Sequence, residues 1–182
     1  MVGIGKNQNR NRDFENRTLE CLDSLYFMAL RLTNSRQDAE DLAQETYRKA
    51  FDHSNQLTDM EKCRPWLYAI MVNTWKNLRT KGSRETSLED WEQGPDSDSN
   101  PDSHQADPEN ELMNQEVRMV VESGLKRLSS HYRMAVVLSD IEGFTYKEIS
   151  EITGWPIGTV MSRLSRARHL LAGDLMKYKG KI

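Results

Sequence analysis

Hydrophobic side chains recur every three or four residues along most of this chain, a spacing typical of amphipathic helices. Between residues 13 and 84 this pattern divides into three segments separated by short polar breaks. Ser35 lies at one break and would cap the helix that follows, and Pro65 suits the first position of a helix. The sequence therefore predicts a three-helix bundle over 13–84, preceded by a flexible polar arm at 1–12.

Each predicted helix of this bundle has one apolar face that would point into a shared core. The first helix runs over 13–32, the second follows Ser35, and the third ends near Gly82. The apolar faces contain Leu19, Leu22, Tyr26, Ala29 and Leu32 in the first helix, Ala39, Leu42, Ala43, Tyr47, Ala50 and Phe51 in the second, and Leu67, Ile70, Met71, Thr74, Trp75 and Leu78 in the third.

A segment of different composition separates this bundle from the rest of the chain. Residues 85–106 are rich in Ser, Pro, Gly and acidic side chains, and too poor in apolar ones to offset the entropy of ordering. Asp107 then precedes Pro108, a combination that starts helices, and the helical period resumes over 107–182. No strand pattern appears. We therefore predict an all-α protein of two small helical domains joined by a flexible acidic linker.

The second predicted domain contains a helix-turn-helix pattern. Thr145 and Glu148 form a capping box before a short apolar-faced helix, Gly154 supplies a turn, and a longer helix runs from about Pro156 toward Tyr178. In such motifs the second helix enters the major groove of DNA. A bundle hairpin or a solvated basic helix that binds no DNA would give the same pattern.

The two sides of that longer helix differ in chemistry. Arg166 could bond a guanine through two hydrogen bonds, whereas Arg163 and Arg168 flank the same face and suit phosphates. The apolar side carries Val160, Leu164, Ala167 and Leu171, and the opposite side carries Ser162, Ser165, Arg166 and His169.

The charge of the chain is strongly patterned, although its net value is only −3 over 182 residues. Residues 62–84 carry 6 basic and no acidic side chains, and residues 85–116 carry 11 acidic and no basic ones. Residues 117–182 are basic again, with 11 basic and 6 acidic side chains. Two basic segments around an acidic one predict two contacts with a polyanion, joined by a segment that avoids it.

Several classes of protein are disfavoured by what the sequence lacks. The longest apolar run, 66–72, is far too short to span a bilayer, and the segment 1–15 lacks a signal peptide's apolar core, so we expect a cytoplasmic protein without membrane insertion. Cys21 and Cys63 do not form a zinc or disulfide motif, and we expect structural thiols. Four scattered histidines and no phosphate loop argue against an enzyme, and no cofactor is expected.

Three segments resemble the extracytoplasmic-function (ECF) sigma factors of bacterial RNA polymerase. The segment 140–168, with its core Pro156-Ile-Gly-Thr-Val-Met-Ser-Arg163, resembles their region 4. Ala39-Glu-Asp-Leu-Ala-Gln-Glu-Thr46 resembles region 2.2, and Pro65-Trp-Leu-Tyr-Ala-Ile70 with Asn73 resembles regions 2.3 and 2.4. The resemblance covers about 14–84 and 107–176.

Other segments resemble particular subgroups of that family. Leu88-Glu-Asp-Trp91 is similar to a stretch of the thiol-oxidative-stress subgroup. Asn73-Thr-Trp-Lys-Asn77 and Asp107-Pro-Glu-Asn110 are similar to an envelope-stress subgroup. The inducing signal is therefore left open between the two.

The resemblance implies a transcription initiation factor that binds core RNA polymerase, recognises −35 and −10 promoter elements and helps to melt DNA. Its partners would be promoter DNA, the clamp helices of the largest polymerase subunit, the flap of the second subunit, and an anti-sigma factor. The implied polymerase-binding residues are Asp38, Glu40, Asp41, Gln44 and Glu45, which would otherwise be an ordinary solvated face.

The resemblance also implies two sets of DNA-binding residues. Met161 and Ser165 stand where many relatives have a basic and a bulky residue, which leaves the promoter preference open. The residues implied for the −10 element are Asn73, Lys76, Asn77, Arg79, Lys81 and Arg84. Those implied for the −35 element are Met161, Ser162, Arg163, Ser165, Arg166 and Arg168.

Two other functions fit parts of the sequence. A sigma mimic would sequester an anti-sigma factor without binding DNA, but it would not need the basic side chains Arg163, Arg166 and Arg168. A dimeric helix-turn-helix repressor would need a dimerisation or ligand-binding segment, and the sequence outside the resemblance to ECF sigma factors contains no such segment.

Overall fold

The computed structural model describes residues 4–82 and 108–179, and every regular element in these ranges is helical, as predicted. The predicted linker lies outside the described residues. The first range contains α1 (Ile4–Glu20), α2 (Leu22–Thr33), α3 (Arg36–Asp52), the short 3-10 turns η1 (Ser54–Gln56) and η2 (Met60–Lys62), and α4 (Cys63–Gly82). The second contains α5 (Pro108–Arg127), α6 (Ser130–Val136), a π-helical turn (Val137–Ile141), α7 (Tyr146–Thr153) and α8 (Ile157–Lys179).

The boundary between α2 and α3 follows from its local sequence. Asn34 adopts a left-handed conformation with φ 55°, and its N–H donates to the Leu30 carbonyl, which ends α2. Asn tolerates this conformation better than most side chains do. The hydroxyl of Ser35 then accepts a hydrogen bond from the Asp38 N–H, so the predicted N-cap of α3 is confirmed.

The N-terminal segment differs from the prediction, because α1 begins at Ile4 where a flexible arm was expected. Side chains of α1 attach this helix to the turns that precede α4. Arg10 Nη2 donates to the Leu57 carbonyl at 2.6 Å, and Arg17 Nη2 contacts Glu61 Oε1 at 2.7 Å. The two pairs are 47 and 44 positions apart in the chain, a separation that a local pattern does not reveal.

The single helix predicted over 13–32 is in fact interrupted at Cys21. The Cys21 N–H bonds to the Thr18 carbonyl at 3.2 Å, three residues back rather than four. The Thr18 hydroxyl in turn donates to the Glu15 carbonyl at 2.8 Å. Such side-chain bonds compete with helical ones, so the chain turns here between α1 and α2.

The buried apolar side chains form one cluster that includes residues from both described ranges. Most predicted core positions are confirmed, with Leu42, Leu67 and Met71 fully buried. Four were wrong: Leu19, Leu22, Phe51 and Leu78 are each more than two-fifths exposed. The largest fully buried side chains are Leu25, Met28, Leu42, Leu67, Tyr68 and Met71 in the first range, and Leu125, Met134, Leu138, Ile149, Ile152 and Leu164 in the second.

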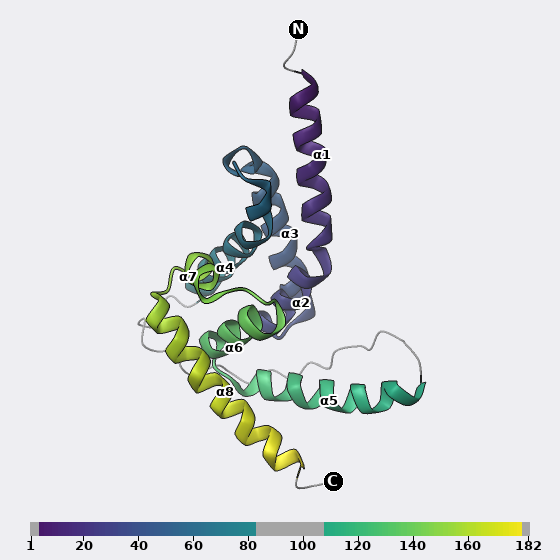
Figure 1. The fold of residues 1–182 in the computed structure, drawn as a ribbon, viewed down its shortest axis with the longest axis vertical. Coiled ribbons are helices and arrows are strands. Elements are labelled where there is room, and N and C mark those ends of the chain that lie inside the picture. Colours follow the sequence, from purple (N-terminus) through teal and green to yellow (C-terminus); the bar gives the residue numbers. More distant parts are fainter. Residues whose placement is uncertain (1–3, 83–107, 180–182) are drawn as a thin grey trace.

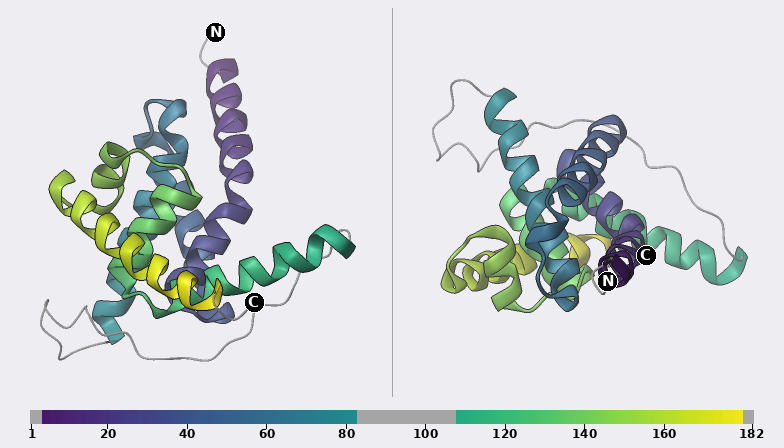
Figure 2. Two further views of the ribbon diagram at one scale, coloured as in Figure 1. Left: turned by 60° about the horizontal axis from the view of Figure 1, so that its bottom comes forward. Right: turned by 90° about the horizontal axis from the view of Figure 1, so that it is seen from above.

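The two groups of helices pack directly against each other. Helix α4 lies between α3 on one side and α7 on the other, and α6 contacts α2 (Figure 1). Helix α8 crosses α6 and also contacts α5 and α7. The far ends of α1 and α5 project from the packed helices (Figure 2). Among the described residues, no helix combines the length and apolar character needed to cross a bilayer.

Candidate nucleic-acid interface

The helix-turn-helix of α7 and α8 is built by hydrogen bonds at its two bends. At the start of α7, the Glu148 N–H donates to Thr145 Oγ1 at 3.3 Å, and Glu148 Oε2 accepts from the Thr145 N–H at 2.8 Å. These bonds from Thr145 hold the pKa of the Glu148 carboxyl below its usual value. Gly154 then takes φ 74°, a left-handed conformation that glycine adopts without steric cost. The predicted capping box and turn are therefore confirmed.

The two sides of α8 are divided as predicted. Val160, Leu164 and Ala167 are at most 1% exposed and pack into the core. The opposite side is solvent-exposed and carries Met161, Ser162, Ser165, Arg166 and His169. This side presents hydroxyl, guanidinium and thioether groups on one rigid helix, and these groups could meet base edges in a major groove.

The two flanking arginines are less free than the sequence indicates. The Arg163 guanidinium is half-buried and lies over the Trp155 ring, 4.1 Å from its centroid. Arg168 Nε donates to Asp140 Oδ2 at 3.0 Å, and this contact lowers the pKa of the Asp140 carboxyl. Both arginines are thus held in defined positions beside the exposed face of α8.

Most residues implied for the −10 element lie within α4. Asn73 and Asn77 are exposed, whereas Lys76 and Arg79 are half-buried against the second group of helices. Lys76 Nζ donates to the Thr153 carbonyl at 2.6 Å, and Arg79 Nη1 to Ser130 Oγ at 3.2 Å.

The charge of Lys76 is affected by this environment. Burial lowers the pKa of its ammonium group, and the nearby charge of Arg163 lowers that pKa further. Lys81 falls in α4, but its side chain lies outside the part that the structure describes, as does the whole of Arg84.

The residues implied for polymerase binding share one polar side of α3. Asp38, Asp41 and Gln44 are exposed there, and Glu40 is exposed in an ion pair with Arg36. Glu45 is the exception, since Arg48 donates to it at 2.7 Å and lowers the pKa of its carboxyl to about 2. The structure therefore brings all five residues together on one helix.

Comparison with known proteins gives the family. The chain matches Sigma-70 region 2 over residues 19–85 and Sigma-70, region 4 over residues 118–171. It is 34% identical over 144 residues to the ECF RNA polymerase sigma-E factor of Haemophilus influenzae, covering 78% of this chain and 76% of that protein. The chain belongs to the ECF sigma factors of RNA polymerase.

Other relatives agree with this assignment. The ECF sigma factor SigE of Mycolicibacterium smegmatis is 33% identical over 162 residues, which are 87% of this chain and 60% of that longer protein. A solved structure of the sigma factor RpoE with the anti-sigma factor NepR, from Bartonella quintana, aligns with a TM-score of 0.71 at 28% identity. That alignment covers 91% of this chain and 98% of the other.

This sigma factor is therefore a transcription initiation factor, and its family is not one of enzymes. Helices α2–α4 belong to region 2, and α6–α8 belong to region 4.

Sequence reasoning missed a group of residues that connect region 2 to region 4. Glu142 is buried and accepts hydrogen bonds from Tyr68 Oη at 2.5 Å and from Arg64 Nη2 at 2.9 Å. Burial and the bond to Glu142 raise the pKa of the Tyr68 hydroxyl, so it stays a donor. The signal in the sequence was weak: Glu142 stands close to apolar neighbours, but nothing nearby indicates its partners.

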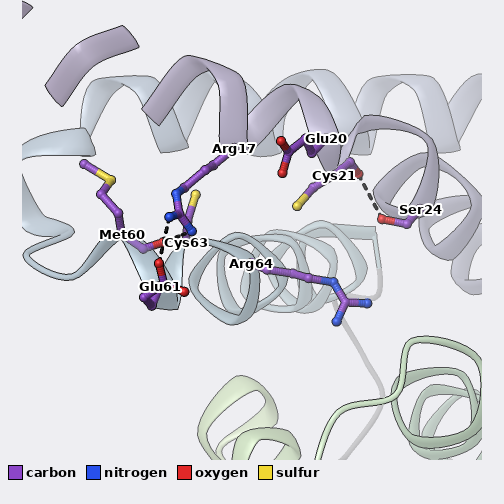
Figure 3. Close-up of a pocket in the computed structure, with 8 residues that line it drawn as sticks. All are labelled: Arg17, Glu20, Cys21, Ser24, Met60, Glu61, Cys63 and Arg64. Carbon is purple, nitrogen blue, oxygen red and sulfur yellow. Dashed lines mark hydrogen bonds and ion pairs between the residues drawn. The ribbon is translucent and has the colours of Figure 1, made fainter. Parts of the chain in front are cut away.

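The two cysteines of this sigma factor line one pocket (Figure 3). The pocket has a volume of about 300 Å³ and lies between the end of α1, the turn η2 and the start of α4. Cys21 and Cys63 are both buried, and burial raises the pKa of the Cys63 thiol to about 11. A thiol with this pKa is a weak nucleophile near neutral pH, in keeping with the expected structural role.

Proposed function

We propose that this sigma factor contacts promoter DNA through two surfaces. The exposed side of α8 would read the −35 element through Met161, Ser162, Ser165 and Arg166, with Arg163 and Arg168 at the phosphates. Asn73, Lys76, Asn77, Arg79, Lys81 and Arg84 would hold the opened −10 strand, where amides can bond extruded bases and basic groups follow the backbone.

The observation that carries this proposal is the division of α8. Its buried side is fixed by Val160, Leu164 and Ala167, so its exposed side is held rigidly toward solvent. Arg166 lies at the middle of that exposed side, with Ser162 one turn before it. A solvated face without a role in binding would need neither this rigid support nor flanking arginines held by Trp155 and Asp140.

We further propose that the polar side of α3 docks on the clamp helices of the largest polymerase subunit, and that region 4 contacts the flap of the second. Four of the five residues on that side of α3 are exposed. The solved relative from Bartonella quintana is bound to an anti-sigma factor. By analogy, we propose that an anti-sigma factor controls this chain as well.

Replacing Arg166 with alanine should reduce −35-dependent transcription about tenfold, because one good arginine contact with a base contributes about 1–3 kcal/mol. The measurement is run-off transcription with purified core polymerase on a genomic promoter library, with wild type and variant side by side. Arg118→Ala is the matched control, since Arg118 is exposed on α5 and outside the proposed surfaces.

Two outcomes of this experiment would contradict the proposal. Unchanged promoter use by Arg166→Ala would show that α8 does not read the −35 element through Arg166. No transcripts and no polymerase binding with the wild-type chain would favour the sigma mimic over a sigma factor active at promoters.

The double variant Asp41→Lys, Gln44→Ala should bind core polymerase at least tenfold more weakly, because it reverses a charge and removes a polar group at the centre of the proposed contact. Both side chains are exposed, so we expect the fold to be unchanged. Asp23→Lys makes the same charge reversal at an exposed site on α2 and is the control. Equal affinity of all three proteins in a titration of labelled core polymerase would show that this side of α3 is only solvated.

A further inference from the structure

Three sulfur-containing side chains line the pocket between the end of α1, the turn η2 and the start of α4. They are the thiols of Cys21 and Cys63 and the thioether of Met60. Both thiols are buried and free, and both point into the pocket from opposite walls (Figure 3). The remaining side chains of the wall are charged or polar: Arg17, Glu20, Ser24, Glu61 and Arg64. Filling of an apolar core alone does not account for two thiols that face a charged pocket.

Two departures from regular α-helical geometry bring these sulfur atoms to one place. The turn η2 is a 3-10 helix, in which side chains three positions apart lie on the same side. The Cys63 N–H bonds to the Met60 carbonyl, so the Met60 thioether and the Cys63 thiol belong to one such turn. On the facing wall the chain turns at Cys21, whose side chain does not cap α2. The three sulfur atoms therefore come from two short segments on either side of one cavity.

An arginine fixes the wall that carries Cys63 and Met60. Arg17 Nη1 donates to the Met60 carbonyl at 3.3 Å, and Arg17 Nη2 contacts Glu61 Oε1 at 2.7 Å. Both bonds join α1 to the turn η2, beside the Cys63 thiol (Figure 3). Because these bonds hold the backbone of the turn, the Met60 and Cys63 side chains are held in place before any ligand enters the pocket.

The charges around the pocket suit a metal complex of two thiolates. Cys21 is the N-cap of α2 and Cys63 is the first residue of α4, so each thiol lies at the positive end of a helix dipole. Burial raises the pKa of both thiols, and the charges of Arg64 and Arg17 act in the opposite direction on Cys21 and Cys63, respectively. A metal ion that replaces the two thiol protons would leave these positive groups in place to stabilise the negative complex.

The donor atoms select a soft metal ion rather than zinc. A structural zinc site takes four ligands, usually from Cys and His. Within the part of the chain that the structure describes, no three His, Cys, Asp or Glu side chains are grouped so that they could hold a metal ion. Two thiolates and a thioether are instead the ligands that suit Cu(I), a soft ion that accepts few donors. Oxidation of these thiols is a poorer alternative, because the thiolate is the form that attacks an oxidant.

We propose that Cys21, Cys63 and Met60 form a binding site for one soft monovalent metal ion of the Cu(I) class. Binding would release the two thiol protons to solvent and leave the copper as Cu(I), so that no oxidant is required. The bound ion would join the turn between α1 and α2 to the start of α4. This site is independent of the promoter and polymerase contacts proposed above.

The test is a titration of the full chain with Cu(I), in ascorbate and without oxygen, against the chromophoric chelator bathocuproine disulfonate. We expect one Cu(I) per chain and an ultraviolet thiolate-to-copper absorption. Loss of an outer-shell partner alone costs about 10–100-fold in metal affinity, so Cys21→Ser and Cys63→Ser should each cost at least about 100-fold. The alanine variants at both positions cover the case in which a buried hydroxyl disturbs folding, and circular dichroism reports the helical content of every variant.

A methionine pair tests the third ligand. Met60→Leu keeps the volume of the side chain and removes its sulfur, and it should weaken Cu(I) binding about tenfold. Met119→Leu is the matched control, because Met119 is 71% exposed on α5 and does not line the pocket. The control should bind Cu(I) as tightly as wild type.

X-ray absorption at the copper K edge identifies the donor atoms directly. A first shell of sulfur alone is the expected result. A first shell containing nitrogen would overturn the proposal, since it would place the ion on exposed imidazoles such as those of His53 and His169. Wild-type affinity in both cysteine variants would overturn it as well. Neither measurement uses polymerase or DNA, so loss of the metal site would leave the promoter proposal standing, and the reverse also holds.

Discussion

Replacing Arg133 with alanine is expected to lower the free energy of unfolding by about 3 kcal/mol, because the change removes the donor of one buried and two partly buried carbonyl groups. Arg133 is only 6% exposed. Its Nη1 donates to the Arg31 carbonyl at 2.6 Å and to Asn34 Oδ1 at 2.8 Å, and its Nη2 donates to the carbonyls of Lys126 and Leu128, each at 2.9 Å.

These four acceptors belong to both regions, so the Arg133 side chain stabilises the α5–α6 connection and also joins it to the end of α2. Lys126 lies in the last turn of α5 and Leu128 between α5 and α6, whereas Arg31 and Asn34 lie at the end of α2 in region 2. Burial lowers the pKa of Arg133 to about 10, so it remains charged at neutral pH. The variant would loosen both the α5–α6 turn and the contact between the regions.

Urea unfolding of the full chain measures this loss. Arg118→Ala is the control, because an exposed arginine on α5 should change stability by no more than about 0.5 kcal/mol. A loss within about 1 kcal/mol for Arg133→Ala would mean that water replaces its guanidinium at the four acceptors, and would contradict this account.

Region 4 could be predicted in detail because its signals are local. The capping box of Thr145 and Glu148, the glycine turn and the apolar period of α8 all lie between Thr145 and Leu171. Each of these features forms through contacts between residues that are close together in the sequence. For the same reason the division of α8 into a buried and an exposed side follows from sequence alone, whereas the roles of its exposed residues remain predictions.

The contact between the regions could not be predicted, because its signals are not local. Tyr68 and Val72 are fully buried on a side of α4 that the single predicted apolar face does not include. The helical period identified the face toward α3, but Tyr68 is buried by Glu142 and Phe144 from region 4. A helix buried on two sides has a weak amphipathic pattern, and its second partner cannot be read from its own sequence.

The same reasoning explains why the hydrogen-bond partners of Lys76 and Arg79 were not predicted. Their charge predicted a contact with a polyanion, and in the free chain a carbonyl and a hydroxyl of region 4 accept their hydrogen bonds instead. The residue type gives the kind of partner that each side chain can take. Tertiary structure decides which partner it has in a given state.

Leu164→Ala is expected to lower the free energy of unfolding by about 3 kcal/mol, since truncating a fully buried leucine loses apolar contacts and leaves a cavity. Leu164 is 1% exposed on the core side of α8, opposite Ser162 and Arg166. Run-off transcription should fall as well, although Leu164 contacts no DNA in the proposed complex, because the side of α8 proposed to face DNA is positioned by its buried side.

Two further variants of α8 test whether the loss of stability comes from lost packing at Leu164 rather than from losing a leucine anywhere on this helix. Leu170→Ala makes the same truncation at a site that is 49% exposed, and should change stability by no more than about 0.5 kcal/mol. Leu164→Met keeps the volume and should retain most of the stability and the transcription. Because one apolar cluster joins the two regions, we expect Leu164→Ala to shift a single unfolding transition. An early, separate unfolding transition confined to region 4 would instead show that the contact between the two regions does not couple their stability.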